Sequence, residues 1–226
     1  MVNFFRQVKT MVWKDLTSEF RTKEMLSSML IFALLVIVIF SFAFNPTRET
    51  TAEVFPGVIW VAFVFASVLG FNRSFTLEKS NDALMGLMLI PADRSVIYFG
   101  KVISNFVVVA LVELISLPLF FILFDYRIEG SIMLLLLVLF LGTVGFIAVG
   151  TFLAALAANT KTSEILLPII MFPIVVPVII AAVESTSVIL GGTSNVELRS
   201  WIMLLAAYDI IFLVVPFVLF DYILEV

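Results

Sequence analysis

The sequence contains no cysteine and no histidine, and charged residues make up only 13% of its 226 positions. The lack of cysteine excludes disulfide bonds, thiolate chemistry and cysteine-based metal sites. The lack of histidine removes the commonest metal and heme ligand and the usual general base near neutral pH. No catalytic constellation can be assembled from the remaining residues, so we expect a chain that is not an enzyme by itself. We also expect it to bind no cofactor or metal of its own.

Hydrophobic residues account for 62% of the chain, whereas soluble domains contain about 45–50%. They occur in long runs, and a bilayer core needs about 20 apolar residues in a helix. Helices are the default structure for such runs, because every backbone polar group in lipid needs an internal partner. We therefore predict an all-α membrane protein, a single domain over residues 1–226, with six transmembrane helices at about 26–44, 54–71, 102–124, 132–158, 165–183 and 201–220.

The positive charges predict the orientation of these spans, because cytoplasmic loops carry an excess of lysine and arginine. Ten basic residues fall on one side if the N-terminus is inside: Arg6, Lys9, Lys14, Arg21, Lys23, Arg73, Lys79, Arg94, Lys101 and Lys161. Only Arg48, Arg127 and Arg199 fall on the other side. We expect an inner-membrane protein with both termini in the cytoplasm. The net charge of −4 and the absence of a polybasic block give no indication of a nucleic-acid partner.

The first 25 residues carry an apolar stripe at helical spacing. The stripe consists of Phe4, Val8, Val12, Leu16 and Phe20, with Phe5 and Met11 nearby, and Arg6, Lys14 and Arg21 lie on the opposite side. This pattern is typical of an amphipathic helix in the membrane interface, with Trp13 near the headgroups. The alternative is a simple basic anchor.

The stretch from residue 72 to residue 101 is the longest one outside the predicted spans. Asp82 can cap a short helix, and Pro91 marks the end of that helix because proline disfavours helical backbone in the residue before it. Asp93 can cap the helix that follows. The short helix would present an apolar face that needs a partner, formed by Leu84, Leu87 and Met88.

The order of an interfacial helix, two spans and the loop LEKSNDALMGLMLIPADRSVIYFGK resembles the permeases of ABC-2-type exporters. The similarity is closest to the CcmB family, the heme exporter permease subunits of cytochrome c maturation. The stretches that carry it are VFPGVIWVAFVFASVLGFNRSF, LGTVGFIAVGTFLAALAANTK and ILLPIIMFPIVVPVIIAA, together with the loop. The resemblance covers essentially the whole chain, and the order and spacing of several weak motifs carry it.

This resemblance implies that the loop is a coupling helix that docks into a separate ATPase subunit, CcmA-like, which binds ATP. The contact candidates are Glu78, Asp82, Leu84, Leu87, Leu89 and Arg94; alternatively, these are solvated charges or residues packed on the chain's own helices. It also implies a homodimer that works with a CcmC-like heme-handling subunit and a CcmE-like heme chaperone, with heme as the cargo of the complex. In agreement with a separate motor, the chain has no P-loop: Gly100-Lys101 precedes Val102, and Ser95 occupies the position of the first P-loop glycine.

Two acids fall inside predicted spans, Glu113 in the third and Asp209 in the sixth. An unpaired carboxylate at the bilayer centre costs about 2.5–3.5 kcal/mol on insertion scales, so each should be protonated, paired or in a polar environment. Each acid either serves a conformational change or a cavity, or locks the bundle through an inter-helix hydrogen bond.

The resemblance implies a permease that couples ATP hydrolysis by its partner to heme export or to release of the heme-loaded chaperone. One alternative keeps this fold but exports a lipid, a drug or a polysaccharide. A second alternative is an ATP-independent scaffold or secondary transporter, although no twin repeat with multiple buried charges is evident.

Overall fold

The structure is a computed structural model that describes residues 2–43, 48–80, 94–125, 130–158, 163–192 and 195–223, with side chains within 4–43, 54–71, 95–125, 130–157, 167–192 and 196–218. This part of the chain forms seven helices and no strand: α1 (Val2–Thr22), α2 (Glu24–Ala43), α3 (Arg48–Ser80), α5 (Arg94–Leu123), α6 (Ile132–Ala158), α7 (Ser163–Leu190) and α8 (Asn195–Ile223). Every one of them except α1 contains a segment long and apolar enough to cross a bilayer. The predicted all-α, six-span fold class is confirmed, and the chain is a multi-pass membrane protein.

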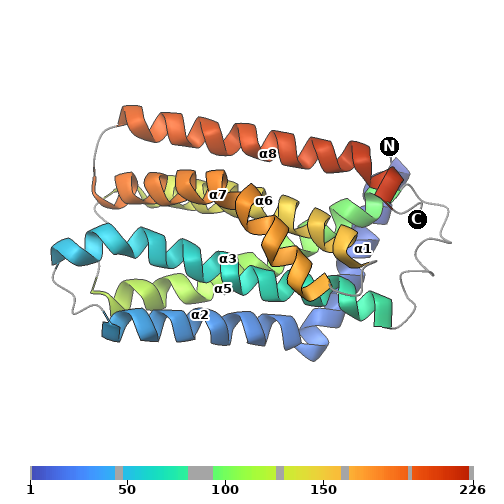
Figure 1. Ribbon diagram of the computed structural model, residues 1–226, viewed down its shortest axis with the longest axis horizontal. Helices are drawn as coiled ribbons and strands as arrows, with labels where there is room; N and C mark the ends of the chain where they lie inside the picture. The colour runs from blue at the N-terminus through green and yellow to red at the C-terminus, as the bar shows by residue number, and fades with distance from the viewer. Residues whose placement is uncertain are drawn as a thin grey trace.

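The six long helices lie side by side along the long axis of the molecule, and α1 lies across one end of this bundle (Figure 1). We call this end the α1 end. The span of α3, Val54–Phe71, is 72% buried because α3 packs against α2, α5, α6 and α7, which makes it the central helix. Helix α8 packs on α6, α7 and α5 and exposes most of its surface. The end of α8 returns to the α1 end (Figure 1).

Helices α3 and α5 extend further than the sequence pattern predicts. Helix α3 continues beyond Phe71 to Ser80, since no proline or glycine interrupts it there, and α5 begins at Arg94. The segment between the two helices is therefore residues 81–93, and not the whole of 72–101. Lys101 lies a full two turns inside α5 and is buried, whereas the sequence places it at the end of a loop.

Helix α7 is one continuous helix despite three internal prolines, and its axis bends visibly (Figure 1). The bend follows from these prolines, because each one removes a backbone donor and crowds the preceding turn. The helix also continues past Val183, where the sequence pattern ends the span. Polar residues are accommodated there because Thr186 Oγ1 donates to the carbonyl of Ala182 at 2.7 Å and accepts from Trp60 Nε1 at 2.9 Å.

Glycines of α6 allow aromatic side chains of α3 to approach its backbone. The Trp60 ring lies where a Cβ on Gly142 would be, and the Phe71 ring occupies the same position at Gly150. Apolar burial does not drive helix association in lipid, so close contacts of this kind contribute much of the packing energy. The register between α3 and α6 is therefore set by two rings seated over two glycines.

Substituting Gly142 with alanine is expected to destabilise the bundle by about 1–3 kcal/mol, because the new methyl group overlaps the Trp60 ring and the hydrogen bond to Thr186 limits how the ring can move. Thermal unfolding in detergent, followed by size-exclusion chromatography, measures this loss. The matched control is Gly57→Ala on α3, where nothing lies within 4 Å of the added methyl group. A Gly142→Ala protein as stable as the Gly57→Ala protein would contradict the packing described here.

The turn between α1 and α2 is tied by one side chain. Lys23, between the two helices, adopts a left-handed backbone conformation with φ 56°, and the chain turns there from the crosswise α1 into α2 (Figure 1). Glu19 on α1 then reaches the start of α2, where its Oε1 accepts from the backbone N–H of Leu26 at 2.8 Å. A carboxylate at a helix N-terminus satisfies an unpaired donor and interacts favourably with the helix dipole. The two helices thus meet at a fixed corner.

Candidate functional site

The predicted coupling residues flank or occupy the segment between α3 and α5. Asp82, Leu84, Leu87 and Leu89 lie outside the described residues, and Glu78 and Arg94 lie on described helices but without described side chains. Their role therefore stays a prediction. The structure does describe the frame around them: α3 ends at Ser80, α5 begins at Arg94, and both ends lie at the α1 end (Figure 1).

Helix α1 packs mainly on α5. Met11 occupies the space beside Gly100, where an added Cβ would lie 2.5 Å from its Cγ. Phe4 meets Phe99 edge to face, with ring centroids 6.2 Å apart. Together these contacts hold α1 crosswise against the helix that directly follows residues 81–93.

An ion pair between a buried lysine and a partly buried aspartate completes this junction. Lys101 Nζ lies 3.1 Å from Asp15 Oδ2, and Lys101 is only 3% exposed. Asp15 Oδ1 also lies 3.1 Å from the half-exposed Lys14 Nζ. Breaking a buried pair costs far more than breaking a surface pair, because the remaining charge stays desolvated. We call the contacts of Met11, Asp15, Gly100 and Lys101 the α1–α5 clamp.

Sequence reasoning missed this clamp. It treated Gly100-Lys101 only as a failed P-loop and counted Lys101 as a loop charge. One signal could have indicated it: Lys101 follows the apolar residues Val96 to Phe99, so it must enter the bundle and needs an acidic partner. The predicted apolar stripe of α1 agrees with the structure in part: Val8 and Met11 are buried against the bundle, whereas Phe5, Trp13 and Phe20 are exposed.

Inside the bundle, α5 carries polar side chains that bond to α6. Glu113 is buried and accepts from Thr143 Oγ1 at 2.6 Å. Asn105 donates from Nδ2 to Thr151 Oγ1 at 3.0 Å. The structure thus gives Glu113 the inter-helix hydrogen bond that the sequence left as one of two possibilities. Such bonds stabilise helix pairs in lipid by about 0.6–2 kcal/mol each.

Tyr98 connects α5 to both α6 and α8. Its hydroxyl lies 3.3 Å from the carbonyl oxygen of Ala148 and 3.2 Å from that of Phe212. Phe212 stands four residues before Pro216, whose missing N–H cannot serve this carbonyl. The Tyr98 hydroxyl therefore supplies the donor that the proline removes.

Replacing Tyr98 with phenylalanine is expected to lower the free energy of unfolding by about 0.5–1.5 kcal/mol, the usual net value of one hydrogen bond. In a Pro216→Ala background the loss should shrink, because the new N–H can serve the Phe212 carbonyl. Thermal unfolding of the two single variants and the double variant measures this coupling. Thr151→Val, which removes the bond to Asn105, should cost the same in both backgrounds. Equal losses for Tyr98→Phe in both backgrounds would refute the assignment.

Asp209 has different surroundings from Glu113. It is only 6% exposed, and neither carboxyl oxygen has a hydrogen-bond partner among the described residues. Its Oδ1 lies against α6, 2.7 Å from where a Cβ on Gly145 would be. The neighbouring Tyr208 hydroxyl instead donates to the carbonyl of Ile174 on α7 at 2.9 Å, within the proline-rich bend. Sequence analysis treats the two acids alike, whereas the structure gives a hydrogen-bond partner to Glu113 and none among the described residues to Asp209.

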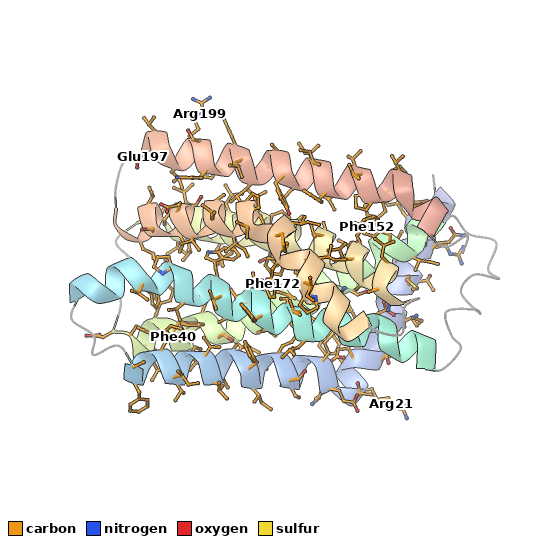
Figure 2. All side chains as sticks on the ribbon, viewed as in Figure 1. Arg21, Phe40, Phe152, Phe172, Glu197 and Arg199 are labelled. Carbon is orange, nitrogen blue, oxygen red and sulfur yellow. The ribbon has the colours of Figure 1, made fainter. Side chains whose placement is uncertain are left out.

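Charged side chains otherwise gather at the two ends of the bundle. Figure 2 shows Arg21 at the α1 end, and Glu197 and Arg199 at the opposite end, where they point away from the helices. Among the described residues, no three acidic side chains are grouped as a metal site. The described site thus consists of a crosswise helix, α1, clamped to α5, and of hydrogen bonds from α5 to α6 and α8.

The family model described as CcmB protein matches residues 6–223, which include the clamp, all six spans and residues 81–93. The chain belongs to the CcmB family. Similar proteins include the Heme exporter protein B of Rhodobacter capsulatus, 28% identical over 69% of this chain and 71% of the relative. That of Pseudomonas aeruginosa is 27% identical over 83% of this chain and 84% of the relative. The Heme exporter protein B of Paracoccus denitrificans is 25% identical over 88% of this chain and 90% of the relative. The resemblance predicted from the sequence to the CcmB family is confirmed.

Proposed function

We propose that this chain is the permease subunit of an ABC transporter complex for cytochrome c maturation. The observation that carries the proposal is membership of the CcmB family over almost the whole chain, with relatives named Heme exporter protein B. The chain would bind no cofactor itself. ATP would be bound and hydrolysed by a separate, CcmA-like subunit, and heme would be the cargo of the complex.

In this proposal residues 81–93 dock into the ATPase subunit, and the α1–α5 clamp transmits the resulting movement. A displacement of this segment acts first on the end of α3 and the start of α5, the helices it joins. Because Lys101 and Gly100 hold Asp15 and Met11, movement of the first turns of α5 also moves α1. The bonds from α5 to α6 and α8 pass the movement deeper into the bundle.

We place the α1 end in the cytoplasm of a cell with an inner membrane. Support comes from the helix ends: α1, the end of α3, the start of α5, and the adjoining ends of α6 and α7 all lie at this end (Figure 1). These segments and their connections carry Lys79, Arg94 and Lys161 in addition to the basic residues of α1. The positive-inside rule then assigns this end to the cytoplasmic face.

The working complex would contain two copies of this chain, two ATPase subunits, and the CcmC-like and CcmE-like heme-handling proteins. Long apolar faces remain uncovered in the single chain, for example Leu35, Ile39 and Phe42 on α2 and Ile169 and Ile180 on α7. Lipid or a second copy would cover them. Native mass spectrometry of the complex extracted in mild detergent measures the subunit ratio.

Expression of this chain in a strain that lacks its own heme exporter protein B tests the proposal. We expect covalent heme staining of c-type cytochromes to return, and an ATPase subunit to co-purify with the tagged chain, when the ATPase of the same source is co-expressed. If an ATPase co-purifies but c-type cytochromes do not return, the chain is a permease for another cargo. If neither occurs, the permease proposal itself is wrong.

A further inference from the structure

A groove of about 410 Å³ lies between α5, α6 and α8. Its walls are the rings of Phe99, Phe106 and Phe140 and aliphatic side chains that include Ile103 and Val144. Asp209 is the one polar residue among the described residues that line it. A volume of this size is in the range of small-molecule sites, which combine apolar walls with a few polar groups.

The carboxyl group at this groove lacks a partner in the described chain. Asp209 is only 6% exposed. Both of its carboxyl oxygens are covered, and neither has a hydrogen-bond partner among the described residues. Buried polar groups almost always have a partner, and an exception requires a physical reason. Glu113, an acid equally buried in the same bundle, has such a partner in Thr143. A donor from outside the chain would remove the exception at Asp209, whose side chain belongs to the lining of the groove although its two oxygens are covered.

The lining indicates the chemistry of that donor. An ionised carboxylate attracts an ammonium group and repels an anion, and the faces of aromatic rings also attract cations. The rings of Phe106 and Phe140 meet edge to face, with centroids 5.3 Å apart, and both line the groove to which Asp209 also contributes. The remaining aliphatic walls suit an alkyl chain or a ring system.

The depth of Asp209 excludes a phospholipid headgroup as the donor. Asp209 lies near the midpoint of the span Val196–Val218. Half of the hydrocarbon core is about 15 Å thick, so the amine of an ordinary phospholipid stays far from this position. A free lipophilic amine, in contrast, can enter along the groove.

We propose that the groove between α5, α6 and α8 binds a lipophilic amine, with its ammonium group on the Asp209 carboxyl and its apolar part between Phe99, Phe106 and Phe140. Because the carboxyl oxygens are covered in the structure, binding includes a change of the Asp209 side-chain conformation. The site is independent of the proposed transport of heme, and its failure would leave that function untouched.

Photolabelling of the purified full-length chain in lipid nanodiscs tests the site, with dodecylamine that carries a diazirine on its chain as the probe. We expect mass spectrometry to find the label on peptides of α5, α6 and α8, and unlabelled dodecylamine to compete. Dodecanoic acid, which has the same chain and the opposite charge, should not compete. Asp209→Asn should reduce the labelling at least tenfold.

Two further variants make the test decisive. Ile103→Trp fills the groove from a surface position and should reduce labelling to a similar extent, so it gives the answer even if Asp209→Asn does not fold. Glu113→Gln neutralises the other buried acid, which does not line the groove, and should leave labelling unchanged. Equal labelling of the wild type and Ile103→Trp, label spread evenly over α2, or competition by dodecanoic acid would overturn the proposal.

Discussion

Replacing Lys101 with methionine is expected to lower the free energy of unfolding by roughly 3 kcal/mol and to reduce c-type cytochrome maturation at least tenfold. The energetic loss follows from breaking a buried ion pair, which typically costs about 3–5 kcal/mol. We expect the lower end of this range, because the half-exposed Lys14 still lies 3.1 Å from Asp15 Oδ1. The functional loss follows from the proposed function: without the pair, α1 no longer follows α5.

The chain contains a matched control for this prediction. Lys14→Met removes the other lysine beside the same carboxylate, but from an exposed position, and should change stability by less than about 1 kcal/mol. The double variant Asp15→Leu/Lys101→Met should be more stable than Lys101→Met alone, since it also removes the partly buried Asp15 carboxylate. Thermal unfolding in detergent and heme staining of membranes measure the two effects. Equal melting temperatures for Lys101→Met and Lys14→Met would show that the clamp contributes nothing.

Replacing Leu87 with glutamate is expected to abolish co-purification of the ATPase subunit and, with it, cytochrome maturation. A charge in the apolar face of the predicted coupling helix would have to be desolvated on docking, which opposes binding by several kcal/mol. One change at the centre of an interface can therefore reduce affinity by two orders of magnitude or more, about 3 kcal/mol. Pull-down of the tagged chain measures the loss.

Leu87→Met is the control for this second prediction, because it keeps the volume and the apolar character of the side chain. The melting temperature of the isolated chain should be the same for both variants, if Leu87 contacts a partner and not the chain's own helices. A Leu87→Glu protein that melts lower but still binds the ATPase would assign Leu87 to the chain's own core. The same comparison can be made at Leu84.

The span number and the helical fold were predictable from the sequence because both depend on local properties. The thickness of the bilayer sets the length of each apolar run, and the absence of water requires helices. Span ends were less predictable where helices keep their hydrogen bonds beyond the apolar run. Helix α7 continues through Thr186 because its hydroxyl bonds within the helix and to Trp60, a residue distant in sequence.

The candidate site depends on relations between helices, which a single sequence pattern does not contain. Glu113 and Asp209 are alike as isolated acids in apolar runs, yet only the register between α5 and α6 brings Thr143 opposite Glu113. The pairing of Lys101 with Asp15 likewise requires α1 to pack against α5, a helix that begins only at Arg94 and is distant from α1 in the sequence. The coupling residues of segment 81–93 were predicted by resemblance alone and remain a prediction.

The location of α1 has a consequence for biosynthesis. The part of α5 that α1 contacts is translated only after the ribosome has added the residues between Thr22 and Arg94. This takes several seconds at about 5–20 residues per second. During this delay Asp15 cannot pair with Lys101, and we expect α1 to lie on the surface of the membrane without its contacts to α5. The exposed rings of Phe5, Trp13 and Phe20 are suited to hold it there until the third span has been inserted.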